Sequence, residues 1–353
     1  MSAAGFAVGA RRIGRDAPVF VVAEAGVNHN GDLALALALV DAAAEAGADA
    51  VKFQTFRTDA LVSRAAPKAG YQVETTGAGE SQRDMLAKLE LSLDQFARVQ
   101  ERCARRGVIF FSTPFDEGSA DALERLGAPL FKVPSGEITN LPYLRHVARK
   151  GRPMIVSTGM STLDEVVAAV AAIRESGHPP IALLQCVSAY PAPPADMNLR
   201  AMDTLRARFG VPIGLSDHSL GLEVALAAVA RGAEIIEKHL TVDKTLPGPD
   251  HRASLDPGEM AALVRGIRTV EAALGDGDKR PTASELDTRR VARKSLVATR
   301  ALRAGERLTA EAVTIKRPGT GIAPGELERA LGRRVRRDLA ADEVIEWSAL
   351  DEG

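Results

Sequence analysis

Two histidines and two lysines occupy comparable positions in the sequence, each near the end of a short apolar run. His218 ends the run "VPIGLSDH" and His239 lies in "EIIEKHLT", while Lys52 and Lys132 lie in "DAVKFQT" and "LFKVPSG". Two imidazoles from neighbouring strand ends can bind one divalent cation and leave coordination positions for water and substrate. Two ammonium groups at the same edge attract a phosphate or a carboxylate. The pattern therefore predicts a metal ion beside an anionic ligand.

Further polar residues lie in the other apolar runs. Hydroxyl groups that could donate hydrogen bonds to the anion are those of Thr113, Ser135, Ser157 and Ser216. Glu24 could bind a metal-bound water or act as a general base. Imidazole with oxygen ligands suits Mn, Fe, Co or Zn, and the spacing does not choose among them. The adjacent Lys238 should point to the opposite side of its strand, toward the helices or an acidic residue such as Glu237 or Glu223.

The apolar runs predict the elements that would position these residues. They are residues 19–26, 49–55, 108–114, 130–136, 153–159, 181–188, 211–218 and 234–241. Continuous apolar runs of this length are typical of strands buried on both faces of a parallel sheet. Amphipathic helical patterns lie between them, many opening with Asp, Ser or Asn and closing on Gly. We therefore predict an α/β fold, a (β/α)8 TIM barrel over residues 1–275, whose active face is formed by the carboxyl ends of the strands.

The remaining chain is expected to form a linker and a second domain. Residues 276–292 are rich in Gly, Asp and charged side chains, which favours a linker, and the short turn-rich segments of 293–353 favour a small, mostly β domain. Residues 56–84 form a long polar excursion, either a substrate-contacting loop or a disordered insertion. His29 and His251 lie in predicted loops, where we expect ordinary hydrogen bonding within the loop.

Composition restricts the class of partner and the compartment. The chain of 353 residues has 45 Lys and Arg against 46 Asp and Glu, so nothing favours nucleic acid or an anionic membrane as a partner. No apolar run approaches the roughly 20 residues of a membrane span, and residues 1–18 have the reverse of a secretory signal pattern. Cys103 and Cys186 are far apart, which fits a reducing compartment. We expect a cytoplasmic protein with a small-molecule substrate.

The motifs taken together resemble those of the sialic acid synthase family along nearly the whole chain. They are "AEAGVNHNGD", "GADAVKFQT", "FFSTPFD", "FKVPSGE", "IVSTGM", "PIGLSDHS", "GAEIIEKHLTVDKTLPGPDH" and the late "KRPGTGI". The resemblance implies a barrel followed by an antifreeze-like (SAF) domain. It also implies a transferase that condenses phosphoenolpyruvate with an N-acetylated mannosamine-type sugar, giving a nonulosonic acid and phosphate.

The resemblance also implies roles for individual residues. His218 and His239 would hold a divalent metal, usually Mn2+, with Mg2+ or Co2+ as alternatives, and Glu24 would act at the reaction centre. Phosphoenolpyruvate would be held by Lys52, Thr113, Lys132, Ser135, Ser157, Ser188 and Ser216. The sugar would be held by Gln54, Tyr190, Asp250 and Arg317. Arg317 would reach the sugar's acetamido group from the partner chain of a domain-swapped homodimer. Ser188 departs from the pattern, because some relatives have a longer Asn there that contacts phosphate.

Several readings stay open. The resemblance favours an N-acetylneuraminate synthase first and an N,N'-diacetyllegionaminate synthase as the alternative, since "AEAGVNHNG" and "PKAGYQ" differ from the pseudaminate synthase pattern. The sugar would be N-acetylmannosamine, its 6-phosphate or 2,4-diacetamido-2,4,6-trideoxymannose. A metal-dependent aldolase or hydrolase, or a lysine Schiff-base enzyme, could use the same barrel. A non-enzymatic ice-binding or carbohydrate-binding module is the third possibility.

Overall fold

The computed structural model describes residues 5–352, which form two compact units that divide between Gly275 and Asp276. Each unit has its own hydrophobic core, and they are described separately. Within the described residues, no helix combines the length and apolar character needed to cross a lipid bilayer. Both cysteines are buried and carry free thiols.

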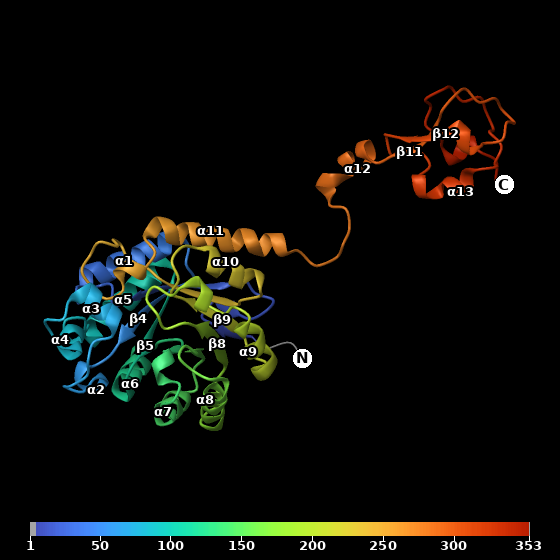
Figure 1. Ribbon diagram of the computed structural model, residues 1–353. Helices are drawn as coiled ribbons and strands as arrows, with labels where there is room; N and C mark the ends of the chain where they lie inside the picture. The colour runs from blue at the N-terminus through green and yellow to red at the C-terminus, as the bar shows by residue number, and fades with distance from the viewer. Residues whose placement is uncertain (1–4, 353) are drawn as a thin grey trace. The chain divides into compact units, whose positions relative to one another are not determined.

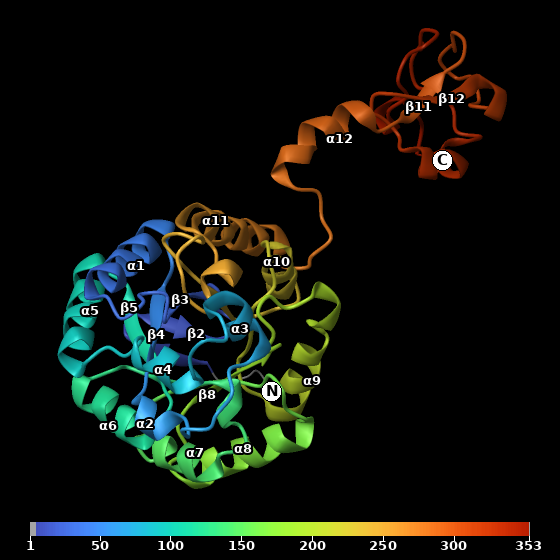
Figure 2. The ribbon, with the colours of Figure 1, turned by 60° about the vertical axis from the view of Figure 1, so that its left-hand side comes forward.

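The first unit is a closed barrel of parallel strands surrounded by helices, which confirms the predicted fold class (Figures 1 and 2). Around the barrel the order is β10-β3-β4-β5-β6-β7-β8-β9, so the last strand closes against the first. The strands are β3 (Phe20–Gly26), β4 (Ala50–Thr55), β5 (Ile109–Pro114), β6 (Phe131–Val133), β7 (Met154–Ser157), β8 (Ile181–Cys186), β9 (Ile213–Asp217) and β10 (Ile235–His239). Each of the eight apolar runs contains one of these strands.

Helices follow the strands and bury one face against the barrel wall. They are α1 (Leu33–Ala46), α5 (Leu93–Arg106), α6 (Glu117–Leu126), α7 (Leu141–Ala148), α8 (Leu163–Glu175), α9 (Ala201–Phe209), α10 (Glu223–Ala230) and α11 (Pro257–Leu274). The caps are those expected from sequence: the Thr162 and Asp256 side chains each accept the amide of a Glu three residues on, closing capping boxes on α8 and α11. Short 3-10 turns η1 (Ser135–Glu137), η2 (Pro194–Asp196) and η3 (His251–Ala253) lie in the loops after β6, β8 and β10.

A hairpin that the sequence did not predict closes the amino-terminal end of the barrel. Strands β1 (Phe6–Val8) and β2 (Arg11–Ile13) pair antiparallel. Their Phe6, Val8 and Ile13 side chains join the apolar cluster formed by inward residues of the barrel strands. This end of the interior is therefore filled with hydrocarbon, so a ligand can enter only at the opposite, carboxyl end.

The excursion after β4 is folded, so the alternative of a disordered insertion is wrong. It contains α2 (Thr58–Leu61), α3 (Gly70–Thr76) and α4 (Gln82–Ala87). A small apolar cluster of Val27, Phe56 and Leu89 anchors it to the loop after β3. These helices were not predicted from the sequence, because each is short, lies in polar sequence and buries only a few side chains.

The second unit begins within the predicted linker, part of which is helical. It contains η4 (Ala283–Glu285), α12 (Leu286–Ala292), β11 (Ser295–Ala298), η5 (Ala310–Ala312), β12 (Val313–Lys316), η6 (Pro324–Glu326), α13 (Leu327–Ala330) and η7 (Trp347–Ala349). Strands β11 and β12 pair antiparallel. Aliphatic side chains such as Leu296, Leu302 and Ile345 form its core. The small, mostly β character predicted for this part of the chain is confirmed.

Candidate active site

Alternation along each strand decides which side chains enter the barrel. On β3, Phe20 and Val22 belong to the interior cluster, so Glu24, two residues further, also faces inward. On β10, Ile235 is interior, which places Glu237 and His239 on the same side. Lys52 follows interior Ala50 on β4 by the same rule. Polar side chains therefore replace apolar ones only in the carboxyl-terminal half of the interior.

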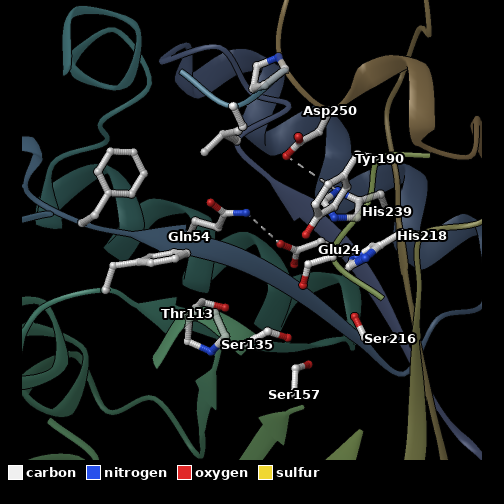
Figure 3. A pocket seen from close by; sticks show the side chains of 18 of the residues that line it. Glu24, Gln54, Thr113, Ser135, Ser157, Tyr190, Ser216, His218, His239 and Asp250 are labelled. Atoms are coloured by element: carbon white, nitrogen blue, oxygen red, sulfur yellow. Dashed lines mark hydrogen bonds and ion pairs between the residues drawn. The ribbon is translucent and has the colours of Figure 1, made fainter. Parts of the chain in front are cut away.

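These inward side chains line one cavity of about 420 Å³ at the carboxyl ends of the strands (Figure 3). Thirteen of the fourteen predicted site residues line it: Glu24, Lys52, Gln54, Thr113, Lys132, Ser135, Ser157, Ser188, Tyr190, Ser216, His218, His239 and Asp250. The fourteenth, Arg317, lies in the second unit, where it is exposed just after β12. The cavity is the largest concentration of buried titratable groups in the described chain.

Two lysines form the base of the cavity, and both already have partners. Lys52 Nζ lies 2.7 Å from Glu24 Oε2 and donates to Thr113 Oγ1 at 3.0 Å. Lys132 Nζ donates to Ser157 Oγ at 2.7 Å. The Gln54 amide nitrogen donates to the other Glu24 oxygen at 3.3 Å. The ammonium groups and hydroxyls thus converge as an anion site requires.

Glu237 is a further member of this site, which was not predicted from the sequence. Its Oε1 lies 3.4 Å from Lys132 Nζ and 3.7 Å from Lys52 Nζ, and it accepts a hydrogen bond from Ser216 Oγ at 3.0 Å. Its Oε2 is buried without a hydrogen-bond partner. The signal was present, because Glu237 precedes His239 by two residues and therefore shares its face.

Lys238 faces away from the cavity as predicted, but the predicted partners were wrong. Its Nζ lies 2.6 Å from Asp217 Oδ2 and donates to the Ser219 carbonyl at 2.7 Å. Asp217 therefore also faces the helices. Parallel pairing of β9 with β10 places Asp217 opposite Lys238, whereas Glu237 is on the other side of the strand.

Burial and charge pairing set the pKa values at the cavity base. Burial raises the pKa of Glu24 to about 7, against the opposing charge of Lys52. Burial also acts to raise the pKa of Glu237, but Lys132 and Lys52 outweigh it and hold that pKa below its usual range. For Lys52, burial is outweighed by Glu237 and Glu24, so its pKa is raised. Burial lowers the pKa of Lys132.

The two histidines lie side by side above this base. Their ring centroids are 5.4 Å apart, and they lie at the carboxyl ends of neighbouring strands, His218 just after β9 and His239 at the end of β10. His218 Nδ1 donates to the Val187 carbonyl at 2.7 Å, so in the neutral ring Nε2 carries the lone pair. Burial acts to lower the pKa of His218, but Cys186 and the Val187 carbonyl outweigh it and raise that pKa. His239 Nδ1 is buried without a hydrogen-bond partner and lies 4.0 Å from Asp250 Oδ2. An unsatisfied buried imidazole nitrogen beside a free one fits a shared metal ion.

The donor set limits how such an ion could be bound. Among residues 5–352, no group of three or more His, Cys, Asp or Glu side chains is arranged to hold a metal. Two imidazoles would therefore leave coordination positions for water or substrate. Burial lowers the pKa of His239 well below its usual range, which keeps the ring neutral and able to donate a lone pair. Burial raises the pKa of Asp250 to about 6.

An aromatic stack forms one wall of the cavity. The Tyr190 ring lies 4.2 Å from the His218 ring and 4.9 Å from the Tyr71 ring, measured between centroids. Tyr71 belongs to α3, so the excursion closes over the site through this contact. The other cavity-lining residues between positions 56 and 86 are Phe56, Leu61, Val62, Ala69, Gln72, Gln82, Met85 and Leu86. Lys52 and Lys132 are the only Lys or Arg residues lining the cavity as described.

The loops after β6, β7 and β8 approach closely at Gly159. Its amide donates to Ser135 Oγ at 2.9 Å. A Cβ at this position would lie 2.5 Å from Ser188 Oγ and 2.8 Å from Ser135 Oγ, so any side chain here would displace these two hydroxyls. This packing brings Ser188 to the cavity despite its short side chain.

The remaining loop histidines lie outside the cavity. His251 has both ring nitrogens partnered, at 2.7 Å from Thr241 Oγ1 and 3.2 Å from Asn30 Oδ1. His29 Nδ1 accepts the Gly31 amide at 3.1 Å. Both make loop hydrogen bonds, as the sequence predicted, and His29 Nε2 is buried without a hydrogen-bond partner.

Comparison with known proteins identifies the family of the chain. Residues 39–279 match the NeuB family and residues 293–351 match the SAF domain. The chain is 48% identical to the N,N'-diacetyllegionaminic acid synthase of Legionella pneumophila, covering 94% of each chain. It is 37% identical to the human N-acetylneuraminate-9-phosphate synthase, covering 97% of this chain and 95% of that one.

A solved structure is also similar. The N-acetylneuraminic acid synthetase of Leptospira borgpetersenii, crystallised with citrate, is 38% identical, with a TM-score of 0.72 over 81% of this chain and 95% of that one. Residues 39–279 are well over half of the chain, and the relatives extend along nearly all of it. The chain therefore belongs to the NeuB family of sialic acid synthases, transferases that use phosphoenolpyruvate to form a carbon–carbon bond, and it carries the SAF domain at its carboxyl end.

Proposed function

We propose that the protein is a nonulosonic acid synthase, which condenses phosphoenolpyruvate, water and an open-chain N-acetylated mannosamine-type sugar. The products are a nine-carbon acid and inorganic phosphate. One observation carries the proposal: a base of lysines and hydroxyls lies in the same buried cavity as a neighbouring histidine pair, at the carboxyl face of the barrel. Family membership supports the same reaction.

Phosphoenolpyruvate would occupy the base of the cavity. Lys52 and Lys132 would neutralise its phosphate and carboxylate, and the hydroxyls of Thr113 and Ser157 already point at these ammonium groups. Fixed donors of this kind stabilise the charge that develops as phosphate departs with carbon–oxygen cleavage. Ser135, Ser188 and Ser216 would donate the remaining hydrogen bonds from the loops after β6 and β8 and from β9.

Glu24 would act as the general base. Attack of the phosphoenolpyruvate methylene on the sugar aldehyde leaves positive character at the phosphate-bearing carbon, and water adds there. A carboxylate with a pKa of about 7 can take the proton of that water at neutral pH. Lys52 and Gln54 hold the two oxygens of Glu24, which fixes the direction of the base.

His218 and His239 would hold a divalent metal ion, for which we propose Mn2+, with Mg2+ or Co2+ as alternatives. When bound, such an ion supplies Lewis acidity at the sugar's aldehyde oxygen. The chain contributes the orientation: the Val187 carbonyl holds the His218 ring, and Tyr190 packs against both imidazoles. Asp250 and Tyr190 would bind the sugar beside them.

The wall of the cavity favours an unphosphorylated sugar with apolar substituents. The side chains from residues 61–86 that line it are aliphatic, aromatic, thioether or amide groups. A sugar 6-phosphate would bring a second dianion, and the only lining lysines are both engaged at the base. We therefore infer 2,4-diacetamido-2,4,6-trideoxymannose, the substrate of the alternative reading, ahead of N-acetylmannosamine. The relatives named as N,N'-diacetyllegionaminic acid synthases support this choice.

We also propose a role for Arg317 in binding the sugar. This arginine is exposed in the second unit, where it makes no ion pair in the described structure. We propose that it reaches the sugar's acetamido group in the partner chain of a domain-swapped homodimer. Residues 276–292, before β11, would provide the connection.

The decisive experiment measures phosphate release and product mass. The purified protein with Mn2+ and phosphoenolpyruvate is incubated with each of the three candidate sugars. We expect phosphate release only when a sugar is present, with a product whose mass equals sugar plus pyruvate. In a parallel incubation, pyruvate replaces phosphoenolpyruvate, and a condensation product formed there would support the aldolase alternative instead. A borohydride-trapped adduct at Lys132 would support Schiff-base chemistry.

A further inference from the structure

The base of the cavity is not a simple cationic site. Its two ammonium groups are matched by two carboxylates, Glu24 and Glu237, so their formal charges cancel. The two acids differ in how they are held. Glu24 contacts one lysine and Gln54, whereas Glu237 is shared by Lys52 and Lys132.

Glu237 is fixed in place. Ser216, Lys52 and Lys132 hold Oε1, and the residue is 4% exposed. Its register partner on β9 is Ser216, so the hydrogen bond joins neighbouring strands and restricts rotation of the carboxylate. The acid cannot swing out to solvent when an anion arrives.

A fixed carboxylate beside both lysines must oppose oxyanions. Charges act over longer distances in a poorly solvated site than in water, so a phosphate held by Lys52 and Lys132 would be repelled by Glu237. The formal charge of the base would be +1 without Glu237. A site with that charge would hold the product phosphate more tightly and release it more slowly.

We propose that Glu237 is a positioning residue that aligns Lys52 and Lys132 and weakens the affinity of the cavity base for phosphate, so that the inorganic product leaves. This inference rests on the proposed function, since it concerns release of the phosphate formed there. It assigns a purpose to a carboxylate that would otherwise only weaken substrate binding.

The variant Glu237→Gln tests the proposal, because it removes the negative charge of this side chain and keeps its shape. The amide oxygen can still accept from Ser216, but the negative charge is lost. Inorganic phosphate binding is measured by calorimetry at fixed Mn2+, without phosphoenolpyruvate or sugar. We expect the variant to bind phosphate about tenfold more tightly. In turnover, the Ki of phosphate and the KM of phosphoenolpyruvate should both fall, kcat should fall, and the KM of the sugar should change little.

Glu234→Gln is the matched control. Glu234 is a buried carboxylate just before the same strand, where it accepts the Ile213 amide at 2.7 Å at the opposite end of the barrel. Its replacement should leave phosphate binding unchanged. Unchanged or weaker phosphate binding by a folded Glu237→Gln protein would overturn the proposal.

A second pair of variants covers the case in which the Gln protein does not fold. Glu237→Asp and Glu237→Asn have the same size and differ in charge, and we expect the Asn protein to bind phosphate more tightly. Equal affinity would contradict the proposal. Absence of phosphoenolpyruvate-dependent phosphate release by the wild type with every sugar would instead reject the proposed function, and the calorimetric comparison would still test the effect of Glu237.

Discussion

Lys238 and Asp217 form an enclosed ion pair between β9 and β10, with side chains 1% and 0% exposed. Removing one partner of such a pair leaves a buried charge uncompensated. We predict that Lys238→Met lowers the free energy of unfolding by about 3–5 kcal/mol, measured by urea denaturation. The double variant with Asp217→Asn should recover much of this loss. If Lys238→Met lowers the free energy of unfolding by less than about 1 kcal/mol, the pair contributes no more than an exposed ion pair does.

Metal removal should abolish turnover because the two histidine rings are positioned to share an ion. Exhaustive chelation is expected to eliminate activity, and Mn2+ to restore it. His239→Ala should lower Mn2+ affinity by at least about tenfold, measured by titration of the metal. His178→Ala is the control, since His178 is exposed after α8. Full activity after chelation would remove the metal from the mechanism.

The pH dependence of kcat/KM should follow the ionisation of the Glu24 carboxyl group. Its pKa is raised to about 7, so the carboxylate is ionised above that pH and protonated below it. Because a general base must be ionised, kcat/KM for phosphoenolpyruvate should fall about tenfold per pH unit below the pKa and level off above it. Glu24→Gln should lose most activity and this acid limb. A flat profile across neutral pH in the wild type would argue against Glu24 as the base.

Arg317→Ala should raise the KM of the sugar by about tenfold or more while the KM of phosphoenolpyruvate stays nearly constant, because a lost charged hydrogen bond costs about 1.5–3 kcal/mol. Arg303→Ala, at another exposed arginine of the second unit, is the control. Equal effects on both substrates would contradict the sugar contact.

Domain swapping can be tested with two impaired variants, assayed at a sugar concentration far below KM, where the raised KM of Arg317→Ala limits the rate. Chains carrying Arg317→Ala and chains carrying His239→Ala would each complement the other in a mixed swapped dimer. Co-refolding should recover up to about a quarter of the wild-type activity, by random pairing of chains. If only the sum of the separate residual activities appears, each site uses its own Arg317.

The cavity wall predicts how sugar preference can be altered. Val62→Lys places a cation among the aliphatic side chains, so turnover of the 6-phosphorylated sugar should rise relative to the diacetamido sugar by about tenfold. Val73→Lys serves as the control, because Val73 is 37% exposed on the same segment. The measurement is kcat/KM for each sugar. An unchanged ratio would show that this wall does not contact the sugar's C6 end.

Short buried strands were predictable because parallel strands covered on both faces are continuously apolar, and this pattern does not depend on the rest of the fold. The capped helices were predictable because capping residues and amphipathic spacing are also local features of the sequence. The hairpin of β1 and β2 was not predictable, since Phe6 and Ile13 acquire their role only when a closed barrel end is present to bury them. The helices of the 56–84 excursion were equally hidden in polar sequence.

The sequence by itself determined which residues lie near the carboxyl ends of the strands. The alternation of side chains between the two faces of a strand and the end of an apolar run are both local properties of the chain. Tertiary structure decided the pairing across strands. Register between β9 and β10 gave Lys238 the partner Asp217 and brought Glu237 between Lys52 and Lys132. Which charges meet depends on closure of the barrel, since these residues are separated by up to 185 positions along the chain and only the closed sheet brings them within hydrogen-bonding or ion-pair distance.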